Sequence, residues 1–484
     1  MSSPDDPTSR DPKGTKVSID SLKTKPFERS LAMTRLGVGA GAKIMAHSIS
    51  NIFRGEVERS DANREFYRRQ AQILADELGN LKGSVMKAGQ MLSLYGQYFL
   101  PEEAVEVLSS LQDDTAPVSW KVVQPVLERA LGRKHMSELE IDETPIAAAS
   151  LGQAHRARRK SDGLDLCIKI QYPGVADAID SDIRTLSRLL IMTRLTPKGL
   201  DITPVFNEVR EMLHREVDYE SERRFTEAFA QRLATDSRFV VPKVIGDYSS
   251  DRVLTTTYEH GKHVRDVAVQ SLNLERRNRL GAAFLELFLA EFFDWGMVQS
   301  DPHFGNYRIR LGENAAPDRI VLLDFGATRI FGRGFIDNYS EIVRGALEHD
   351  HDRIFRGARG IGIMQDGFPR SVVSAFAQMC EQIVEPFASV DDPRVPKQLR
   401  NADGAYCWGE SDLPMRAGRV AAVSALTRHF RLPPREIVFL HRRLAGVFIM
   451  LATLHCELDS REMLQRTLAR QAAPDAGDPA VDDR

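Results

Sequence analysis

A short acidic pattern between residues 301 and 326 constrains the fold of this chain more than any other feature. Asp301 and Asn306 enclose four residues in a sequence typical of a loop, and the apolar run Val321–Leu323 leads directly to Asp324 and a Phe-Gly pair. Asp324 follows Asp301 by 23 positions (324 − 301). The pattern predicts a strand that delivers one carboxylate to a turn, close to a loop that carries another. Carboxylate and amide oxygens are the protein ligands that Mg²⁺ prefers.

The same motifs occur in the catalytic loop and the Asp-Phe-Gly turn of protein kinases. In those enzymes the first Asp orients the attacking hydroxyl or water, while the Asn and the second Asp bind Mg²⁺ at the phosphates of ATP. We therefore predict Asp301 as the catalytic residue, with Asn306 and Asp324 as metal ligands. Gln299 and Ser300 stand where a protein kinase has His-Arg. Taken singly, each motif also fits a polar loop or a capped strand end.

A single lysine interrupts the strand-like apolar run Leu166–Ile170. A buried ammonium group is costly unless it is paired. We therefore expect Lys169 to bind the α- and β-phosphates of ATP and a helix carboxylate, as the strand lysine of kinases does. The alternative is a lysine on an edge strand whose amine reaches water.

A segment of small residues lies upstream, where kinases place a glycine-rich loop over the phosphates. It consists of Ala147, Ala148, Ala149, Ser150 and, after one leucine, Gly152. Gly152 precedes Lys169 by 17 positions (169 − 152), which suits a hairpin. Alanine disfavours the positive-φ conformations that glycine allows, so we expect a stiffer nucleotide-binding loop. The alternative is the start of an alanine-rich helix.

Acidic residues gather on a helix predicted over Val205–Leu233. Asp218 and Glu222 are four apart and would share a helix face. Glu216 and Glu222 are six apart and would point about 240° away from each other. One helix could then offer Glu222 to one cation and Glu216 to another. A solvated acidic face is the alternative.

A further candidate segment is Lys87-Ala-Gly89-Gln90. Lys87 and Gln90 are three apart and share a face of a predicted helix. Glycine inside a helix lowers stability, so Gly89 indicates close packing against another backbone. A plain helix surface is the alternative.

The predicted elements divide the chain into an α+β fold with two lobes. Short strands are expected at Pro145–Ala157, Leu164–Ile170 and Arg252–Tyr258, and a helix at Trp120–Leu131 should end at Gly132. The predicted parts are a disordered segment at 1–25, a helical extension at 26–135, a mixed α/β lobe at 136–261, a mostly helical lobe at 262–471 and a disordered tail at 472–484.

Composition excludes several classes of protein. Lys and Arg number 65 against 68 Asp and Glu, which gives no electrostatic footprint for nucleic acid. The 4 cysteines form no C-x-x-C pair, which fits a reducing, cytoplasmic location. No run is apolar for the roughly 18–20 residues that a membrane-spanning helix needs. We expect Leu444–Leu454 to be a buried core helix. An amphipathic helix at 31–53 would lie on a membrane surface, at its inner face, or pack on the protein core.

Taken together, the motifs at 87–90, 147–150, 169–174, 216–218, 301–306 and 324–326 resemble the UbiB/AarF atypical kinase family, most closely its mitochondrial coenzyme-Q branch. The resemblance runs from about residue 29 to about residue 468. It implies a protein-kinase-like fold with a helical extension specific to the family. In that family the K-x-G-Q segment lies over the active site, where a peptide substrate would otherwise bind. Lys87 would pair with Glu216, and Lys169 with Glu222.

The resemblance also implies ATP and Mg²⁺ as cofactors and an ATPase or atypical kinase activity that supports ubiquinone biosynthesis. Isoprenoid lipids and quinone-biosynthesis proteins are the implied partners. The segment Val253–Gly261 departs from the family, which often has Met and Glu in the middle of this strand. Backbone groups near Thr257 and Glu259 would then contact adenine. Two alternatives stay open: a phosphotransferase for a small molecule or protein, and a nucleotide-gated scaffold of a biosynthetic complex.

Overall fold

The computed structural model describes residues 117–192, 203–313, 316–413, 416 and 434–472, with isolated positions at 68, 69, 72, 87–89, 91 and 105. The predictions for residues 1–25, for the helix at 31–53, for Gln90 and for the tail beyond 472 fall outside the described residues. The chain separates into two compact units. The first comprises Met1–Glu220 and Val244–Tyr258, and the second comprises Ser221–Lys243 and Glu259–Arg484.

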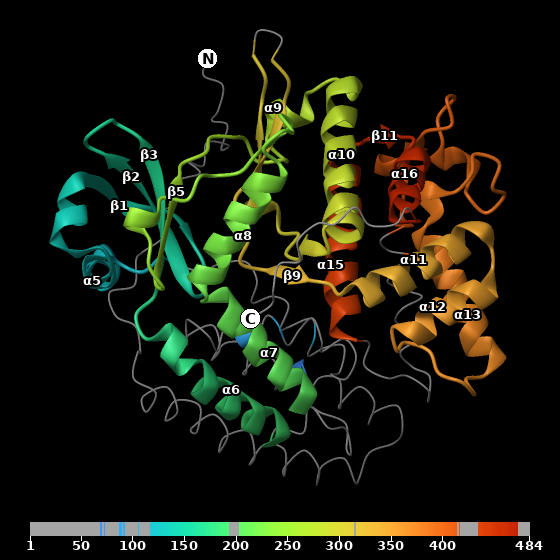
Figure 1. The fold of residues 1–484 in the computed structure, drawn as a ribbon, viewed down its shortest axis with the longest axis horizontal. Coiled ribbons are helices and arrows are strands. Elements are labelled where there is room, and N and C mark those ends of the chain that lie inside the picture. The colour runs from blue at the N-terminus through green and yellow to red at the C-terminus, as the bar shows by residue number, and fades with distance from the viewer. Residues whose placement is uncertain are drawn as a thin grey trace, which may run out of the picture. The chain divides into compact units, whose positions relative to one another are not determined.

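An antiparallel four-stranded sheet forms the centre of the first unit, in the order β1-β2-β3-β5 (Figure 1). Its strands are β1 (Leu139–Ala148), β2 (Gly152–Arg159), β3 (Asp165–Gln171) and β5 (Val253–Thr257). Along β3, Leu166, Ile168 and Ile170 are fully buried on one face. Helix α5 (Trp120–Glu138) contacts β1 and β3 and buries Val123 and Leu127. The alternation along β3 places Lys169 on the opposite face of an interior strand.

The strand predicted at Pro145–Ala157 is wrong, because two strands and a turn occupy this segment. β1 ends at Ala148 and β2 begins at Gly152, with the Ala149 amide donating to the Gly152 carbonyl at 2.8 Å. The alternative of a helix start is excluded as well. The small residues at 147–152 were expected both in a strand and in a loop, and the turn observed here agrees with the loop. The strands expected near Leu164–Ile170 and Arg252–Tyr258 are confirmed as β3 and β5.

The single helix predicted over Val205–Leu233 is also wrong. The chain forms α7 (Thr203–Glu216) and α8 (Tyr219–Arg232), which are separated at Val217 and Asp218. The Gln171 side-chain amide donates to the Val217 carbonyl, which fixes this carbonyl outside the helical hydrogen-bond pattern. Because this contact comes from 46 positions away, no local pattern announced the break. Asp218 and Glu222 therefore do not share one continuous helix, and the angle predicted between Glu216 and Glu222 does not apply.

Two further helices belong to the first unit, and the sequence predicted where the regular part of one of them ends. Helix α6 (Val175–Met192) packs against α7. Helix α5 extends to Glu138, beyond the predicted stop, but Gly132 within it has φ 71° and ψ 169° and interrupts the helical backbone. The glycine thus ends the regular helix at the predicted position, and a further turn follows it.

The described part of the second unit consists mainly of helices, and short strands lie in the segments that connect them. The helices are α9 (Val267–Gln270), α10 (Leu274–Leu289), a π-helical turn (Ala290–Asp294), α11 (Arg333–Glu348), α12 (His351–Gly360), α13 (Arg370–Ile383), α15 (Arg435–Thr453) and α16 (Ser460–Ala472). The strands are β4 (Phe239–Val240), β6 (Met297–Gln299), β7 (Tyr307–Arg310), β8 (Arg319–Leu322), β9 (Thr328–Ile330), β10 (Tyr406–Cys407) and β11 (Glu457–Leu458).

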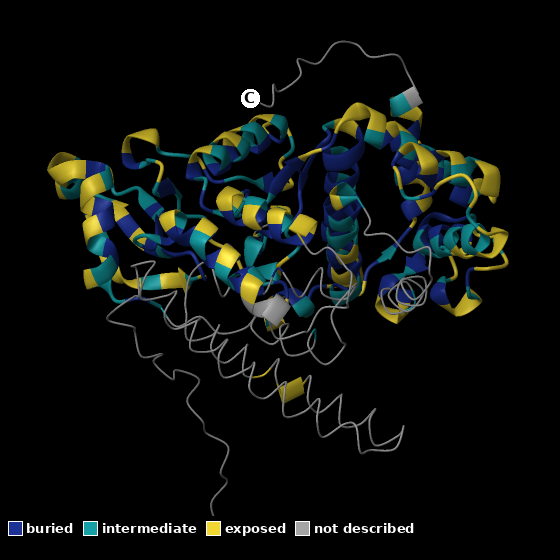
Figure 2. Ribbon diagram, turned by 90° about the horizontal axis from the view of Figure 1, so that it is seen from below, coloured by how far each residue is buried: buried dark blue, intermediate teal, exposed yellow. Residues whose placement is uncertain are grey.

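The core of the second unit lies between α10, α11, α13, α15 and α16. Buried, intermediate and exposed residues follow one another along the helices of the molecule, as amphipathic sequences require (Figure 2). The prediction of a core helix at Leu444–Leu454 is confirmed within α15, where Val447 and Leu451 are fully buried. Among the described residues, no helix combines the length and the apolar character that crossing a membrane requires.

Candidate active site

The loop between β6 and β7 brings Asp301 and Asn306 into direct contact. The Asn306 side-chain nitrogen donates to the Asp301 carboxylate at 3.0 Å and to the Asp301 carbonyl at 3.3 Å. A 3₁₀ turn over Phe304–Asn306, in which the His303 ring accepts from the Gly305 amide, holds this geometry. The contact directs the amide oxygen of Asn306 away from Asp301, where it can serve as a ligand. The spacing read from the sequence therefore corresponds to a real juxtaposition.

Strand β8 delivers Asp324 to the predicted turn. The Asp324 carboxylate accepts from the Gly326 amide at 3.0 Å, and the Gln299 side chain donates to the Asp324 carbonyl at 3.3 Å. Phe325 is buried and packs on Phe229, with ring centroids 4.7 Å apart. The Asn306 carbonyl accepts from the Leu323 amide at 2.9 Å, which ties this segment to the Asp301 loop. The second unit thus assembles Asp301, Asn306 and Asp324 from two adjacent segments.

Glu222 on α8 lies against the same turn. It is buried, and a Cβ atom added to Gly326 would lie 3.2 Å from its Oε2 and 3.5 Å from Asp324 Oδ1. A side chain at position 326 would therefore crowd the Glu222 carboxylate and contact that of Asp324. The proximity of Glu222 to the Asp-Phe-Gly turn agrees with a functional acid at this position, in place of a solvated acidic face.

Sequence reasoning missed Arg442 on α15. Its guanidinium nitrogen Nη2 lies 2.8 Å from Asp301 Oδ1, and both side chains are half-buried. One carboxylate oxygen of Asp301 thus binds Arg442 while the other accepts from Asn306. The two contacts fix the orientation of the carboxylate. The only sequence signal was the basic run His441-Arg442-Arg443, which directly precedes the core helix predicted at Leu444–Leu454.

A buried ion pair supports the loop from behind. Both Arg443 and Glu291 are almost fully buried, and two nitrogens of the guanidinium each lie 3.1 Å from an oxygen of Glu291. Arg443 also donates to the Tyr307 hydroxyl at 2.8 Å, and that hydroxyl donates to Gln299 at 3.1 Å. Because Gln299 binds the Asp324 carbonyl, this network reaches the metal-ligand candidates through hydrogen bonds.

In the first unit, Lys169 occupies the interior strand β3, paired with Ala154 on one side and Leu254 on the other. The alternative of an edge-strand lysine is therefore wrong. Its ammonium lies 5.2 Å from the centre of the Tyr219 ring, in cation–π geometry. Lys169 remains half-buried. Its predicted pairing with Glu222 stays a prediction.

The small-residue loop closes tightly over β3. A Cβ atom on Gly152 would lie 2.6 Å from the Ile170 carbonyl oxygen and 2.9 Å from the Tyr219 hydroxyl, so only glycine fits here without a shift. Ser150 is buried, while Ala147 and Ala149 are exposed and Ala148 is half-buried. The exposed alanines leave one side of the loop accessible to a ligand.

The two residues predicted to lie near adenine differ in their surroundings. Thr257 ends β5 opposite Leu166. The Glu259 side chain accepts from Arg310 at 2.6 Å. This contact engages the carboxylate of Glu259, in agreement with the expectation that backbone groups serve at this position.

The ion pair predicted between Lys87 and Glu216 is present, with the ammonium 2.8 Å from the carboxylate. Both side chains are about one quarter exposed, at 25% and 29%. Ala88 and Gly89 are buried, in agreement with the close packing inferred from Gly89. A regulatory role for Lys87, Gly89, Gln90, Glu216 and Asp218 stays a prediction.

Reversing the Lys87–Glu216 pair should separate its role in stability from its role in regulation. Each single change, Lys87→Glu or Glu216→Lys, should lower the free energy of unfolding by about 0.5–1 kcal/mol, since partly exposed pairs contribute little. Lys87→Glu with Glu216→Lys should recover most of it. Denaturant titration of the four proteins checks this. The pairing would be contradicted if the double variant lost as much unfolding free energy as the two single variants lose together.

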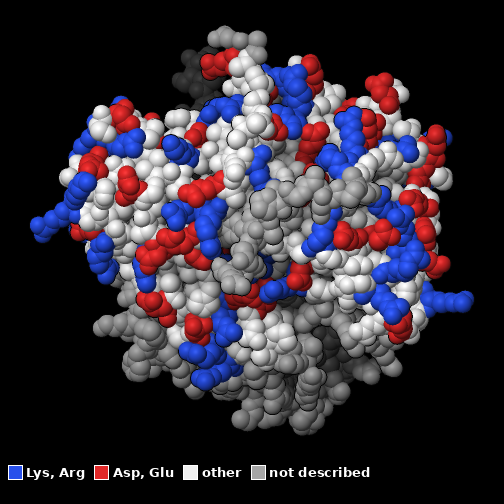
Figure 3. All heavy atoms as spheres, viewed as in Figure 1, with Lys and Arg blue, Asp and Glu red and all other residues white. Residues whose placement is uncertain are grey.

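Charges of both signs are intermingled over the face of the molecule shown in Figure 3, where Lys and Arg lie among Asp and Glu.

Among the described residues, no group of three or more His, Cys, Asp or Glu side chains could hold a metal ion. A cation at Asn306 and Asp324 would therefore need further oxygen ligands. Phosphates and water commonly complete a Mg²⁺ shell of this kind.

Comparisons with known proteins agree with this geometry. The family model described as the ABC1 atypical kinase-like domain matches residues 110–357, which is just over half of the chain. The mitochondrial atypical kinase COQ8B of Rattus norvegicus is 31% identical over 90% of this chain and 78% of its own length. The mitochondrial atypical kinase coq-8 of Caenorhabditis elegans is 32% identical over 88% of this chain and 54% of its own length.

A solved structure shares the fold. The structure of the complex of Rv3197 with erythromycin from Mycobacterium tuberculosis superposes with a TM-score of 0.55 and is 26% identical in sequence. The match covers 87% of this chain and 98% of that one. The predicted α+β, kinase-like fold and the resemblance drawn from the motifs are both confirmed. This chain belongs to the family of ABC1 atypical kinase-like proteins.

Proposed function

We propose that this chain is a Mg²⁺- and ATP-dependent ATPase or atypical kinase that supports isoprenoid-quinone biosynthesis or lipid homeostasis. The observation that carries the proposal is the contact between Asp301 and Asn306 beside the Asp324 turn. This arrangement combines a positioned carboxylate with two oxygen ligands for a cation, which is the equipment that phosphoryl transfer needs.

In this proposal, Asn306 and Asp324 hold Mg²⁺. The metal, when bound, neutralises charge on the phosphates of ATP. Lys169 binds the α- and β-phosphates, and Ala147–Gly152 cover them. Asp301 orients the attacking hydroxyl or water. Arg442 keeps the Asp301 carboxylate in place through the 2.8 Å contact. Positioning and electrostatics would supply most of the rate enhancement.

The same proposal gives the segment around Lys87 a regulatory role. Its ion pair with Glu216 ties it to helix α7, which is continuous in sequence with Asp218 and α8. In the resembled family this segment replaces a bound peptide. We therefore favour ATP hydrolysis, or transfer to a lipid or small molecule, over phosphorylation of proteins.

Quinone metabolism enters the proposal from the relatives named above, which are mitochondrial atypical kinases of the COQ8 type. Enzymes or lipids of isoprenoid-quinone biosynthesis are the proposed partners, together with the nucleotide. The cytoplasmic location and the peripheral contact with a membrane stay predictions.

A nucleotide-gated scaffold is the second candidate. This candidate is favoured because both carboxylate oxygens of Asp301 are already bound, one by Arg442 and the other by Asn306. A scaffold would retain function in cells after Asp301→Asn but lose it after Lys169→Ala. Transfer of radiolabel from ATP to a metabolite or protein would instead favour a phosphotransferase.

Quinone profiling of a deletion strain tests the proposed function. Loss of the chain should lower isoprenoid-quinone levels, and wild-type protein should restore them while Asp324→Asn should not, because the variant lacks the carboxylate charge that would hold the metal. The matched control is Asp337→Asn, at an exposed position on α11. Unchanged quinone levels in the deletion strain would remove the pathway from the proposal.

A further inference from the structure

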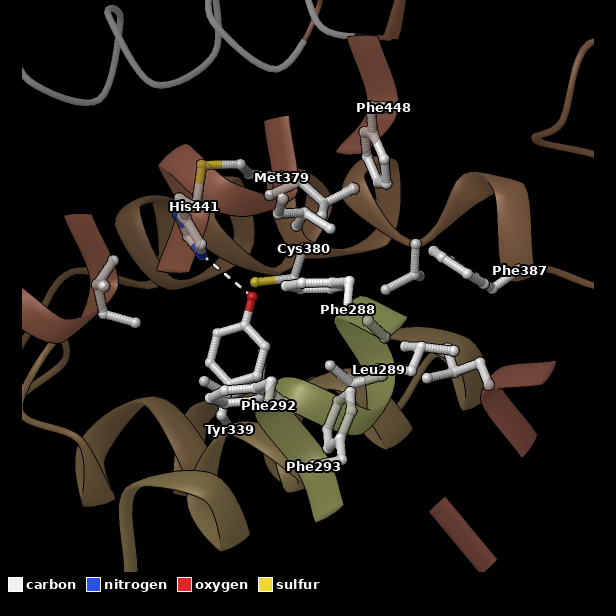
Figure 4. Close-up of a pocket in the computed structure, with 18 of the residues that line it drawn as sticks. Phe288, Leu289, Phe292, Phe293, Tyr339, Met379, Cys380, Phe387, His441 and Phe448 are labelled. Carbon is white, nitrogen blue, oxygen red and sulfur yellow. Dashed lines mark hydrogen bonds between the residues drawn. The ribbon is translucent and has the colours of Figure 1, made fainter. Parts of the chain in front are cut away.

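An apolar cavity lies among the helices of the second unit, apart from the residues placed in the active site (Figure 4). We propose that this cavity is a binding site for an uncharged, largely apolar small molecule that carries one hydroxyl or carbonyl group. The inference goes beyond the proposed ATP chemistry, because none of the cavity residues has a role in it.

The position and lining of the cavity favour a ligand over a packing defect. The void amounts to about 60 Å³, several times the roughly 10–15 Å³ that one water molecule needs. Protein interiors contain few voids larger than a water molecule, and an empty apolar void lowers stability in proportion to its volume. Ligand sites often lie between packed helices. Here α10, α11, α13, α15 and α16 all contribute to the wall.

The wall is made of aromatic and aliphatic side chains. Figure 4 shows Phe288, Phe292 and Phe293 from α10 and the following turn facing Met379 and Cys380 of α13 across the cavity. Of the described residues, no Asp, Glu, Lys or Arg lines it. A charged group placed here would lose its hydration without gaining a partner. The ligand should therefore be uncharged.

One polar feature interrupts this wall. The Tyr339 hydroxyl and His441 Nε2 share a hydrogen bond of 3.1 Å, drawn as the dashed line in Figure 4. Burial lowers the pKa of His441 to about 4, so the imidazole is neutral near pH 7. The Tyr339 oxygen can exchange a further hydrogen bond with a hydroxyl or carbonyl group. The pair can thus orient one polar group of an otherwise apolar ligand.

Several large apolar residues of the wall retain accessible surface. Phe376, Met379, Ile383 and Leu444 line the cavity and are half-buried. A ligand in the cavity would cover this surface and gain the corresponding hydrophobic free energy. Met379 can also adapt its shape to different ligands.

Calorimetric titration of the full chain with three eight-carbon probes tests the proposal near pH 7. We expect octan-1-ol to bind saturably at one site, and octanoate and octylammonium to bind at least tenfold more weakly, since their charged groups find no partner. Tyr339→Phe should weaken octan-1-ol binding about fivefold, the effect of losing one neutral hydrogen bond. Tyr258→Phe, in the first unit, is the matched control and should change nothing.

A variant that fills the cavity with a larger side chain provides the second arm of the test. Met379→Trp should abolish octan-1-ol binding by occupying the void, whereas Val390→Trp, at an exposed position outside the wall, should not. Ile383→Trp replaces Met379→Trp if circular dichroism shows the latter to be unfolded. The proposal is overturned if wild-type protein fails to bind octan-1-ol, if octanoate binds as tightly, or if the folded tryptophan variant binds like wild type.

Discussion

Asp324→Asn should lower the Mg²⁺-dependent rate of ATP hydrolysis by about 10²–10³-fold, as the loss of one essential electrostatic group in an active site does. The amide has the shape of the carboxylate and can still accept from the Gly326 amide, so the turn should persist. What disappears is the negative charge that would hold the cation at the phosphates. Phosphate release at saturating ATP and Mg²⁺ measures the effect.

The control for this variant is Asp337→Asn, which removes a carboxylate from a solvent-exposed pair with Arg333 and should hydrolyse ATP like wild type. Circular dichroism and the unfolding midpoint should match wild type for both proteins. Full hydrolytic activity in a folded Asp324→Asn protein would contradict the role assigned to this residue.

Arg443→Met should lower the free energy of unfolding of the second unit by about 3–5 kcal/mol, the cost of leaving one member of a buried ion pair without its partner. Arg443 and Glu291 are 0% and 1% exposed, so water cannot replace the lost contact. Tyr307 would lose a donor as well. Denaturant titration followed by tryptophan fluorescence measures the loss.

Two further variants separate the pair from simple packing. Arg443→Met with Glu291→Leu should recover most of the lost stability, since apolar residues of similar volume often replace a buried pair at little cost. Arg470→Met removes an arginine from a partly exposed pair with Asp294 and should cost about 1 kcal/mol or less. A loss below about 1 kcal/mol for Arg443→Met alone would show that the buried pair contributes little.

The motifs around Asp301 and Asp324 could be predicted because each of them lies within a few consecutive residues. The spacing of Asp301 and Asn306, and the apolar run before Asp324, each describe a loop or a strand end within a few residues. The structure places them together through short-range hydrogen bonds. The apolar run around Lys169 predicted its strand, whereas the interior position of that strand comes from its pairing with β2 and β5.

Contacts between distant residues could not be read in this way. Arg442 contacts Asp301 from 141 positions away, and Arg443 contacts Glu291 from 152 positions away. Neither separation leaves a periodic trace in the sequence. The break at Val217 also depends on a distant residue, because Gln171 at the end of β3 binds the Val217 carbonyl. The end of β1 at Ala148 could not be located because small residues fit strand, turn and helix alike.

Calorimetric titration of ATP into the purified full chain is the most direct test of whether this site binds ATP through Mg²⁺. We predict saturable binding in the presence of Mg²⁺ that weakens by at least tenfold when EDTA removes the metal, and likewise in Asp324→Asn but not in Asp337→Asn. Absence of any Mg²⁺-dependent nucleotide binding by folded wild-type protein would contradict the account.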